Sequence, residues 1–124
     1  MSAREPTDTY YRLMAVAEGD VDFLLCLIKA FLGDVPRKLA ALQGAISLGN
    51  WEEARVELAN IKSSGELLGF SVMAEKCRQL EAELSSGALL LALLMEYQRI
   101  ETELRVILER AGLAEARVSP VTEG

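Results

Sequence analysis

The side chains that could do chemistry in this 124-residue sequence are carboxylates, two cysteines and a set of lysines and arginines, because histidine is absent. Without imidazole the chain lacks the commonest general base, the usual partner of cysteine in metal sites and any phosphohistidine. Acidic pairs such as Glu52 with Glu53 and Glu101 with Glu103 fall on expected polar helix faces, with neither a ligand set nor a nucleophile beside them. We therefore expect that the protein is not an enzyme and holds no metal and no cofactor.

The cysteines and glycines do not follow the patterns of known sites either. Cys26 and Cys77 lack CxxC spacing and lie in apolar helical surroundings, which favours two buried thiols over a disulfide or a metal site. No glycine follows a strand pattern, and the GxGxxG and GxxxxGK[ST] spacings of phosphate loops are missing. Nucleotide binding therefore has no support.

One polar stripe is more informative. It lies about 100° around a helix from a neighbouring apolar stripe, since Ala59 directly follows the apolar Leu58. Its members are Arg55, Ala59, Lys62, Ser63 and Glu66. Spacing alone indicates an exposed, solvated face, because amphipathic helices normally carry one.

Periodicity predicts that helices position this stripe. Apolar residues recur at helical spacing over residues 7–17, 20–48, 51–68, 71–84 and 88–111, and no strand pattern occurs. Asp20, Asn50 and Ser71 are the expected N-caps. Gly33-Asp34 should interrupt the second segment and Pro36 should restart it, which predicts a kinked or two-part helix. Short connections make successive helices antiparallel, so we predict an all-α, up-down-up-down four-helix bundle with a short extra N-terminal helix.

Length and composition are those of one globular domain. Half of the residues (51%) are hydrophobic and 26% are charged, the balance of a chain with a real core. We expect an N-terminal segment with a short helix over 1–19, the bundle over 20–111 and a flexible C-terminal tail over 112–124. The net charge of −6 repels the phosphate backbone, so nucleic acid is not an expected partner.

The longest apolar run, Ala88 to Met95, is too short to cross a bilayer, and the first residues lack an apolar signal segment. We therefore expect a cytoplasmic protein with no membrane contact. The run cannot face one core along its whole length. Either the N-terminal helix covers it, which is the preferred expectation, or residues 88–95 form an exposed patch that could support a homodimer.

The segment Leu58-Ala59-Asn60-Ile61-Lys62-Ser63-Ser64-Gly65-Glu66-Leu67-Leu68-Gly69-Phe70 resembles the signature of histidine-containing phosphotransfer (Hpt) domains, A-H-x-[LI]-K-G-[SA]-[SA]-x-x-[LIV]-G. The positions that match are Ile61, Lys62, Ser64, Leu68 and Gly69. Residues 31–39 are similar to the family's F-x-x-x-x-P-x-x-L, and residues 80–81 to its L-E, so the resemblance covers about residues 20 to 110. It implies a four-helix bundle with the phosphorylated histidine exposed midway along one helix.

Two departures from the family pattern change what the resemblance implies. Ala59 stands where the family has its phosphoacceptor histidine, and a methyl group has no lone pair to attack phosphorus. Shifting the register by one residue would place Asn60 there, which is no phosphoacceptor either. Ser63 stands where the family has glycine and narrows the approach to position 59. Lys62 is kept, and it could still meet the acidic phosphorylation pocket of a receiver domain.

The leading hypothesis is therefore a pseudo-Hpt protein of two-component or phosphorelay signalling. It would dock on the receiver domain of a response regulator or hybrid histidine kinase, and modulate it by occupancy without accepting phosphate. One alternative is a competent phosphotransfer protein with an engineered histidine-to-alanine change, against which Ser63 argues, since a single change would leave the glycine in place. Another is a structural bundle that self-associates.

Overall fold

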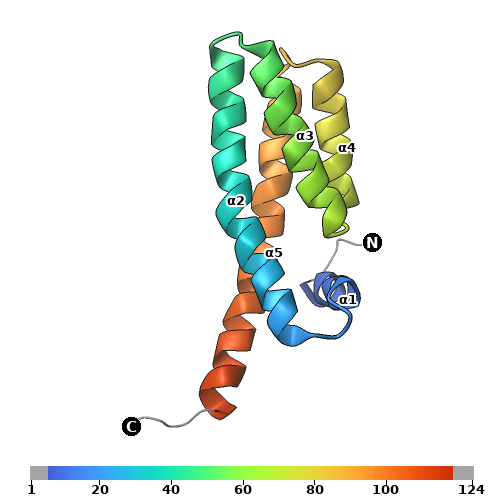
Figure 1. Ribbon diagram of the computed structural model, residues 1–124, viewed down its shortest axis with the longest axis vertical. Helices are drawn as coiled ribbons and strands as arrows, with labels where there is room; N and C mark the ends of the chain where they lie inside the picture. Colours follow the sequence, from blue (N-terminus) through green and yellow to red (C-terminus); the bar gives the residue numbers. More distant parts are fainter. Residues whose placement is uncertain (1–5, 119–124) are drawn as a thin grey trace.

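The computed structural model describes the backbone of residues 6–118 and the side chains of residues 8–112. The described part contains no strand, and its helices are α1 (Pro6–Val16), α2 (Val21–Ser47), α3 (Trp51–Leu67), α4 (Ser71–Ala82) and α5 (Gly87–Val118). Helices α2 to α5 form an up-down-up-down four-helix bundle, and α1 lies across one end of it (Figure 1). The predicted all-α fold with a short extra N-terminal helix is confirmed.

Two of the three predicted N-caps are confirmed. The side chain of Asp20 accepts a hydrogen bond from the backbone N–H of Phe23 at 3.1 Å, and Asn50 accepts one from the N–H of Glu53 at 3.2 Å. The prediction for Ser71 is wrong, because Phe70 is the N-cap and makes no side-chain cap bond. Phe70 is fully buried, so apolar packing fixes the start of α4 instead of a hydroxyl group.

The two-part alternative for the second segment is wrong, since α2 is one continuous helix that contains Pro36. A proline inside a helix removes one backbone hydrogen bond and costs about 3 kcal/mol. The buried side chains of Phe31, Val35 and Leu39 lie on both sides of it, and each stabilises the helix by about 1.5 to 3 kcal/mol. Packing therefore outweighs the proline, and the two ends of α2 stay in one helix.

The last two helices differ from their expected ends. Helix α4 ends at Ala82, and Ser86 caps α5 by accepting the N–H of Leu89 at 3.1 Å. Helix α5 then continues past Gly112 to Val118, because a glycine costs a helix only about 1 kcal/mol. The expected end near residue 111 is wrong, so the first residues of the expected tail are helical. Residues 119–124 lie outside the described part of the chain.

The apolar stripe of α3 packs as its spacing predicts. Ala54, Leu58, Ile61 and Gly65 are all buried. A Cβ atom at Gly65 would come within 3.0 Å of Met73 Cε and 3.6 Å of the Phe70 carbonyl oxygen, so glycine permits the close approach of α4. This packing fixes the opposite face of α3 toward solvent.

The apolar run over 88–95 is not covered by α1. Helix α1 bonds to Glu103, and Figure 1 shows it at the opposite end of the bundle from the start of α5. Leu91 and Met95 are 56% and 60% exposed, while Leu93 is fully buried. The preferred expectation of cover by the N-terminal helix is therefore wrong, and two large apolar side chains of this run face solvent.

The expectation for the thiols is half right. Both cysteines are free; Cys77 is buried, but Cys26 is exposed on the side of α2 away from the core. Within the described residues no three His, Cys, Asp or Glu side chains come together as a possible metal site. Over the same residues, every helix is too short or too polar to cross a bilayer.

Candidate functional site

The structure places the predicted polar stripe on the solvent side of α3. Arg55, Ala59, Ser63 and Glu66 are exposed, and Lys62 is half-buried. Ala59 lies near the middle of the helix, one turn before Ser63. The stripe predicted from spacing is therefore a continuous surface with an uncharged centre.

Two charged side chains on one flank of this surface, Lys62 and Glu66, form ion pairs with residues of α4. The Lys62 ammonium nitrogen Nζ lies 3.8 Å from Glu81 Oε1, and Glu66 Oε2 lies 3.4 Å from a guanidinium nitrogen of Arg78. The Glu66–Arg78 pair is exposed and the Lys62–Glu81 pair is partly exposed, and pairs of this kind contribute at most about 1 kcal/mol. They orient the side chains without holding them firmly.

Sequence reasoning missed two exposed apolar side chains on the same surface. Val56 is 53% exposed and Leu67 is 67% exposed. Together with the uncharged residues between them they form what we call the α3 crest: Val56, Ala59, Asn60, Ser63 and Leu67. The spacing 56, 60, 63, 67 is that of one helix face, so the pattern was visible once the core stripe had been identified.

A groove of about 580 Å³ lies beside the crest, between α2 and α3. Its residues are Leu27, Lys29, Ala30, Phe31, Gly33, Asp34, Arg37, Ser64, Leu67 and Leu68. Apolar side chains form most of the lining, while Lys29, Asp34 and Arg37 add charge on α2. Sequence reasoning missed this groove, because it depends on the contact between two helices.

Two carboxylates, Asp34 of α2 and Glu57 of α3, have shifted pKa values. A hydrogen bond from Lys38, whose Nζ lies 2.7 Å from Asp34 Oδ2, lowers the pKa of Asp34. Partial burial raises the pKa of Glu57, and the neighbouring carboxylate of Glu53 raises it further. Acidic charge therefore gathers on this flank and Lys38 partly balances it.

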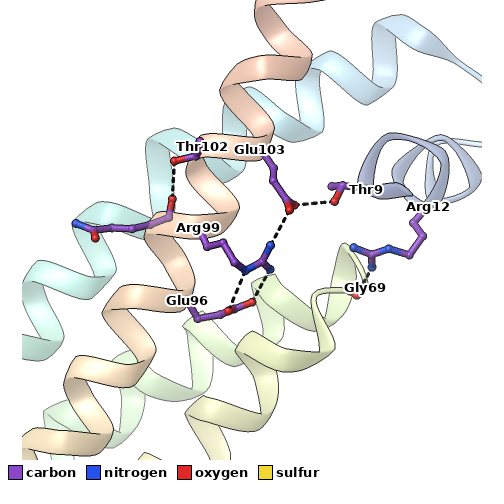
Figure 2. Close-up of polar contacts among 8 residues, drawn as sticks. Thr9, Arg12, Gly69, Glu96, Arg99, Thr102 and Glu103 are labelled. Carbon is purple, nitrogen blue, oxygen red and sulfur yellow. Dashed lines mark hydrogen bonds and ion pairs between the residues drawn. The ribbon is translucent and has the colours of Figure 1, made fainter. Parts of the chain in front are cut away.

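Helix α1 is held against the end of the bundle by polar contacts (Figure 2). The Arg12 guanidinium donates a 2.7 Å hydrogen bond to the Gly69 carbonyl, at the C-terminal end of α3, and lies 5.8 Å from the centre of the Phe70 ring. The Thr9 hydroxyl donates to Glu103 Oε1 at 2.7 Å. The bond from Arg12 ties α1 to the end of α3, the helix that carries the crest, and the bond from Thr9 ties α1 to α5.

The Glu103 carboxylate belongs to a charged network on α5. It accepts a 2.6 Å hydrogen bond from Arg99, which also donates two hydrogen bonds to Glu96, at 3.2 and 2.7 Å. The hydrogen bonds to Glu96 are the main reason that the pKa of Arg99 is raised. Thr9 is fully buried and Glu103 is 6% exposed, so this end of the network lies beneath α1, while Arg99 is partly exposed.

The centre of the crest offers binding rather than reaction. Ala59 presents a methyl group, and the chain contains no imidazole. The thiol of Cys77 on α4 offers no nucleophile, because burial raises its pKa to about 12, which keeps it protonated and unreactive. The arrangement can contact a partner through apolar and small side chains flanked by charges.

Comparison with known proteins gives one finding. A family model for the Hpt domain matches residues 27–111, from the first half of α2 through most of α5. No curated protein and no solved structure matches the chain.

Proposed function

Because this chain belongs to the Hpt domain family, we propose that it is a docking protein of phosphorelay signalling that accepts no phosphate. It binds the receiver domain of a response regulator or hybrid histidine kinase in the cytoplasm. Its effect comes from occupancy, because a bound copy keeps a true phosphodonor away from the receiver. The protein is not an enzyme in this proposal.

The observation that carries the proposal is the exposed alanine at position 59. In the resemblance, the phosphoacceptor histidine occupies this position, and in the structure Ala59 faces solvent near the centre of α3. The surface around Ala59 corresponds to the surface around the phosphohistidine of the family, but the methyl group of Ala59 cannot form a bond to phosphorus. Loss of the acceptor without loss of the surface supports binding without transfer.

The apolar part of the surface supports an interaction face over a plain solvated one. Leu67 is 67% exposed and also lines the groove, which continues the crest onto Leu27 and Ala30 of α2. Large exposed apolar side chains that form one patch with a charged rim are typical of binding surfaces. A solvated helix face has no need of them.

The charges around the patch favour an acidic partner. The chain carries a net charge of −6, and Asp34 lies among the groove residues. The cations that an acidic partner would meet are Lys62 and Arg55 beside the crest, and Lys29 and Arg37 in the groove. Receiver phosphorylation pockets, in the family that this chain resembles, contain clustered carboxylates. Opposite charges on the two faces would steer the encounter and fix the register.

The test is charge reversal at Lys62. We expect Lys62→Glu to weaken receiver binding by about 5- to 150-fold, because like charges then meet near the centre of the interface. The matched control is Arg105→Glu on α5, the helix diagonal to α3 in the bundle, whose described backbone stays away from that of α3. Titration calorimetry gives the affinity and circular dichroism the helicity. Equal affinities of parent and Lys62→Glu for every receiver would refute the docking face.

Substitution at position 59 separates a natural docking protein from an engineered one. We expect Ala59→His alone to restore little phosphotransfer, and Ala59→His with Ser63→Gly to restore more, because the serine side chain narrows the approach. Full transfer by the single variant would indicate an engineered change on a competent surface. The natural genomic codon for residue 59 answers the same question directly.

A second candidate function rests on a different surface. Leu91 and Met95 are exposed one turn apart on α5, which favours self-association of a structural bundle. Sedimentation velocity of the parent and of Leu91→Glu distinguishes the two: a dimer that the substitution abolishes supports this candidate, and a monomer in both cases opposes it.

A further inference from the structure

We infer that Glu81 of α4 pairs with Lys62 in the free protein and competes for it with a partner's carboxylates, so that the docking face selects partners that present a cluster of carboxylates. This inference rests on the proposed function and names the partner chemistry that the same site would accept. It assigns a role in specificity to a residue on α4, outside both the crest and the groove.

The geometry places Lys62 between two positions. On α3 it follows Ala59 by three residues, so a small rotation of its side chain can bring the ammonium group over the crest. In the structure Nζ instead lies 3.8 Å from Glu81 Oε1, with side chains 27% and 45% exposed. A separation near the upper limit for an ion pair, in an exposed setting, is easily exchanged for another partner.

The charges on α4 are ordered to match those on α3. Glu81 faces Lys62, and Arg78 faces Glu66 at 3.4 Å while it also pairs with Glu75 at 2.9 Å. Of the carboxylates in the described chain, Glu81 is the one within 4.0 Å of Lys62. On this flank both cations, Lys62 and Arg78, are therefore already paired, and the carboxylates outnumber them by one.

This arrangement has a consequence for partner choice. A partner with one carboxylate would exchange one exposed ion pair for another and gain almost nothing. Glu81 would also repel the incoming group, because it remains beside Lys62. Several carboxylates around one point on a partner attract Lys62 more strongly than the single carboxylate of Glu81 does. Glu81 therefore increases the difference in affinity between strongly and weakly acidic partners.

The test compares Glu81→Gln with Glu75→Gln. Both substitutions remove one negative charge from an exposed position of α4, but Glu75 pairs with Arg78 and not with Lys62. We expect Glu81→Gln to strengthen binding to a receiver domain by about two- to five-fold and to steepen its salt dependence, because the released lysine interacts more fully with the partner. Glu75→Gln should change the affinity much less.

A double-mutant cycle separates release of Lys62 from a general change of charge. In a Lys62→Gln background we expect Glu81→Gln to have no effect on affinity. Circular dichroism of each variant verifies that the bundle is intact. An effect of Glu81→Gln that persists in this background, or that Glu75→Gln reproduces in full, would overturn the inference.

The proposed function fails in a different way from this inference. If the folded parent and the folded Glu81→Gln variant bind no receiver, the proposed function is wrong and the inference falls with it. If the parent binds a receiver and Glu81→Gln binds it equally well, the docking function stands and the role of Glu81 alone is refuted.

Discussion

The Glu103 carboxylate beneath α1 allows a sharp test of how α1 is held to the bundle. Its two oxygens accept hydrogen bonds from Thr9 at 2.7 Å and from Arg99 at 2.6 Å. We predict that Glu103→Ala lowers the free energy of unfolding by about 2 to 4 kcal/mol.

The magnitude follows from which groups lose a partner. The Thr9 hydroxyl is fully buried, and an unpaired buried donor costs about 1 to 3 kcal/mol. The bond from Arg99 is charge-assisted and contributes about 1.5 to 3 kcal/mol when both partners are present. Arg99 keeps both hydrogen bonds to Glu96, so no guanidinium is left unpaired and the loss stays below the simple sum.

Urea unfolding followed by far-ultraviolet circular dichroism measures the effect. Thr9→Val keeps the shape and leaves Glu103 paired with Arg99, so we expect a loss of about 1 kcal/mol. Added to Glu103→Ala, it should cost little more or even recover stability, because the unpaired hydroxyl is removed. The control is Glu101→Ala, whose carboxylate pairs with the exposed Arg105 and should change stability by no more than about 0.5 kcal/mol.

Two results would contradict this account of α1. A loss below about 1 kcal/mol for Glu103→Ala would show that the buried carboxylate contributes little. Full additivity of Thr9→Val and Glu103→Ala would show that the two side chains do not act as a pair.

Three further predictions follow from burial. One thiol, that of Cys26, should react with a thiol reagent in the native protein, and Cys77 should react only after unfolding. Burial raises the pKa of Cys77 from its ordinary 9.0 to about 12, so as the pH rises the thiol of the unfolded chain loses its proton before that of the folded chain. The contribution of this thiol to the free energy of unfolding is therefore full below pH 9 and should fall by about 1 kcal/mol by pH 10. Cys77→Ala should remove this pH dependence. Leu58→Glu places a charge at a side chain that is 1% exposed and should abolish the cooperative thermal transition.

Much of the fold was predictable because local patterns and tertiary packing agree. The stripe of Ala54, Leu58 and Ile61 has one period and one buried face. Asp20 and Asn50 precede helices, and each side chain accepts the backbone N–H of the residue three positions ahead. Where prediction failed, packing outweighed a local signal. Val35 and Leu39 hold α2 together through the proline, and the buried Phe70 replaces Ser71 as the start of α4.

The candidate site was predictable along α3 and not across helices. Spacing placed Ala59, Lys62 and Ser63 on one exposed face, as the structure does. The pairing of Lys62 with Glu81 and the groove beside Leu67 depend on how α2 and α4 lie against α3, which a one-dimensional pattern does not contain. The exposure of Cys26 was missed for the same reason, because residues that are adjacent to it in the sequence do not have to surround it in the fold.

The central claim is that the chain docks on a receiver domain and takes no phosphate from it. The most direct measurement incubates the chain with radiolabelled, phosphorylated receiver domains of its source organism in Mg²⁺, and follows complex formation and the position of the label together. We predict saturable binding to at least one receiver, with all label remaining on the receiver or released as inorganic phosphate. Label found on this chain, or binding to none of the receivers, would contradict the account.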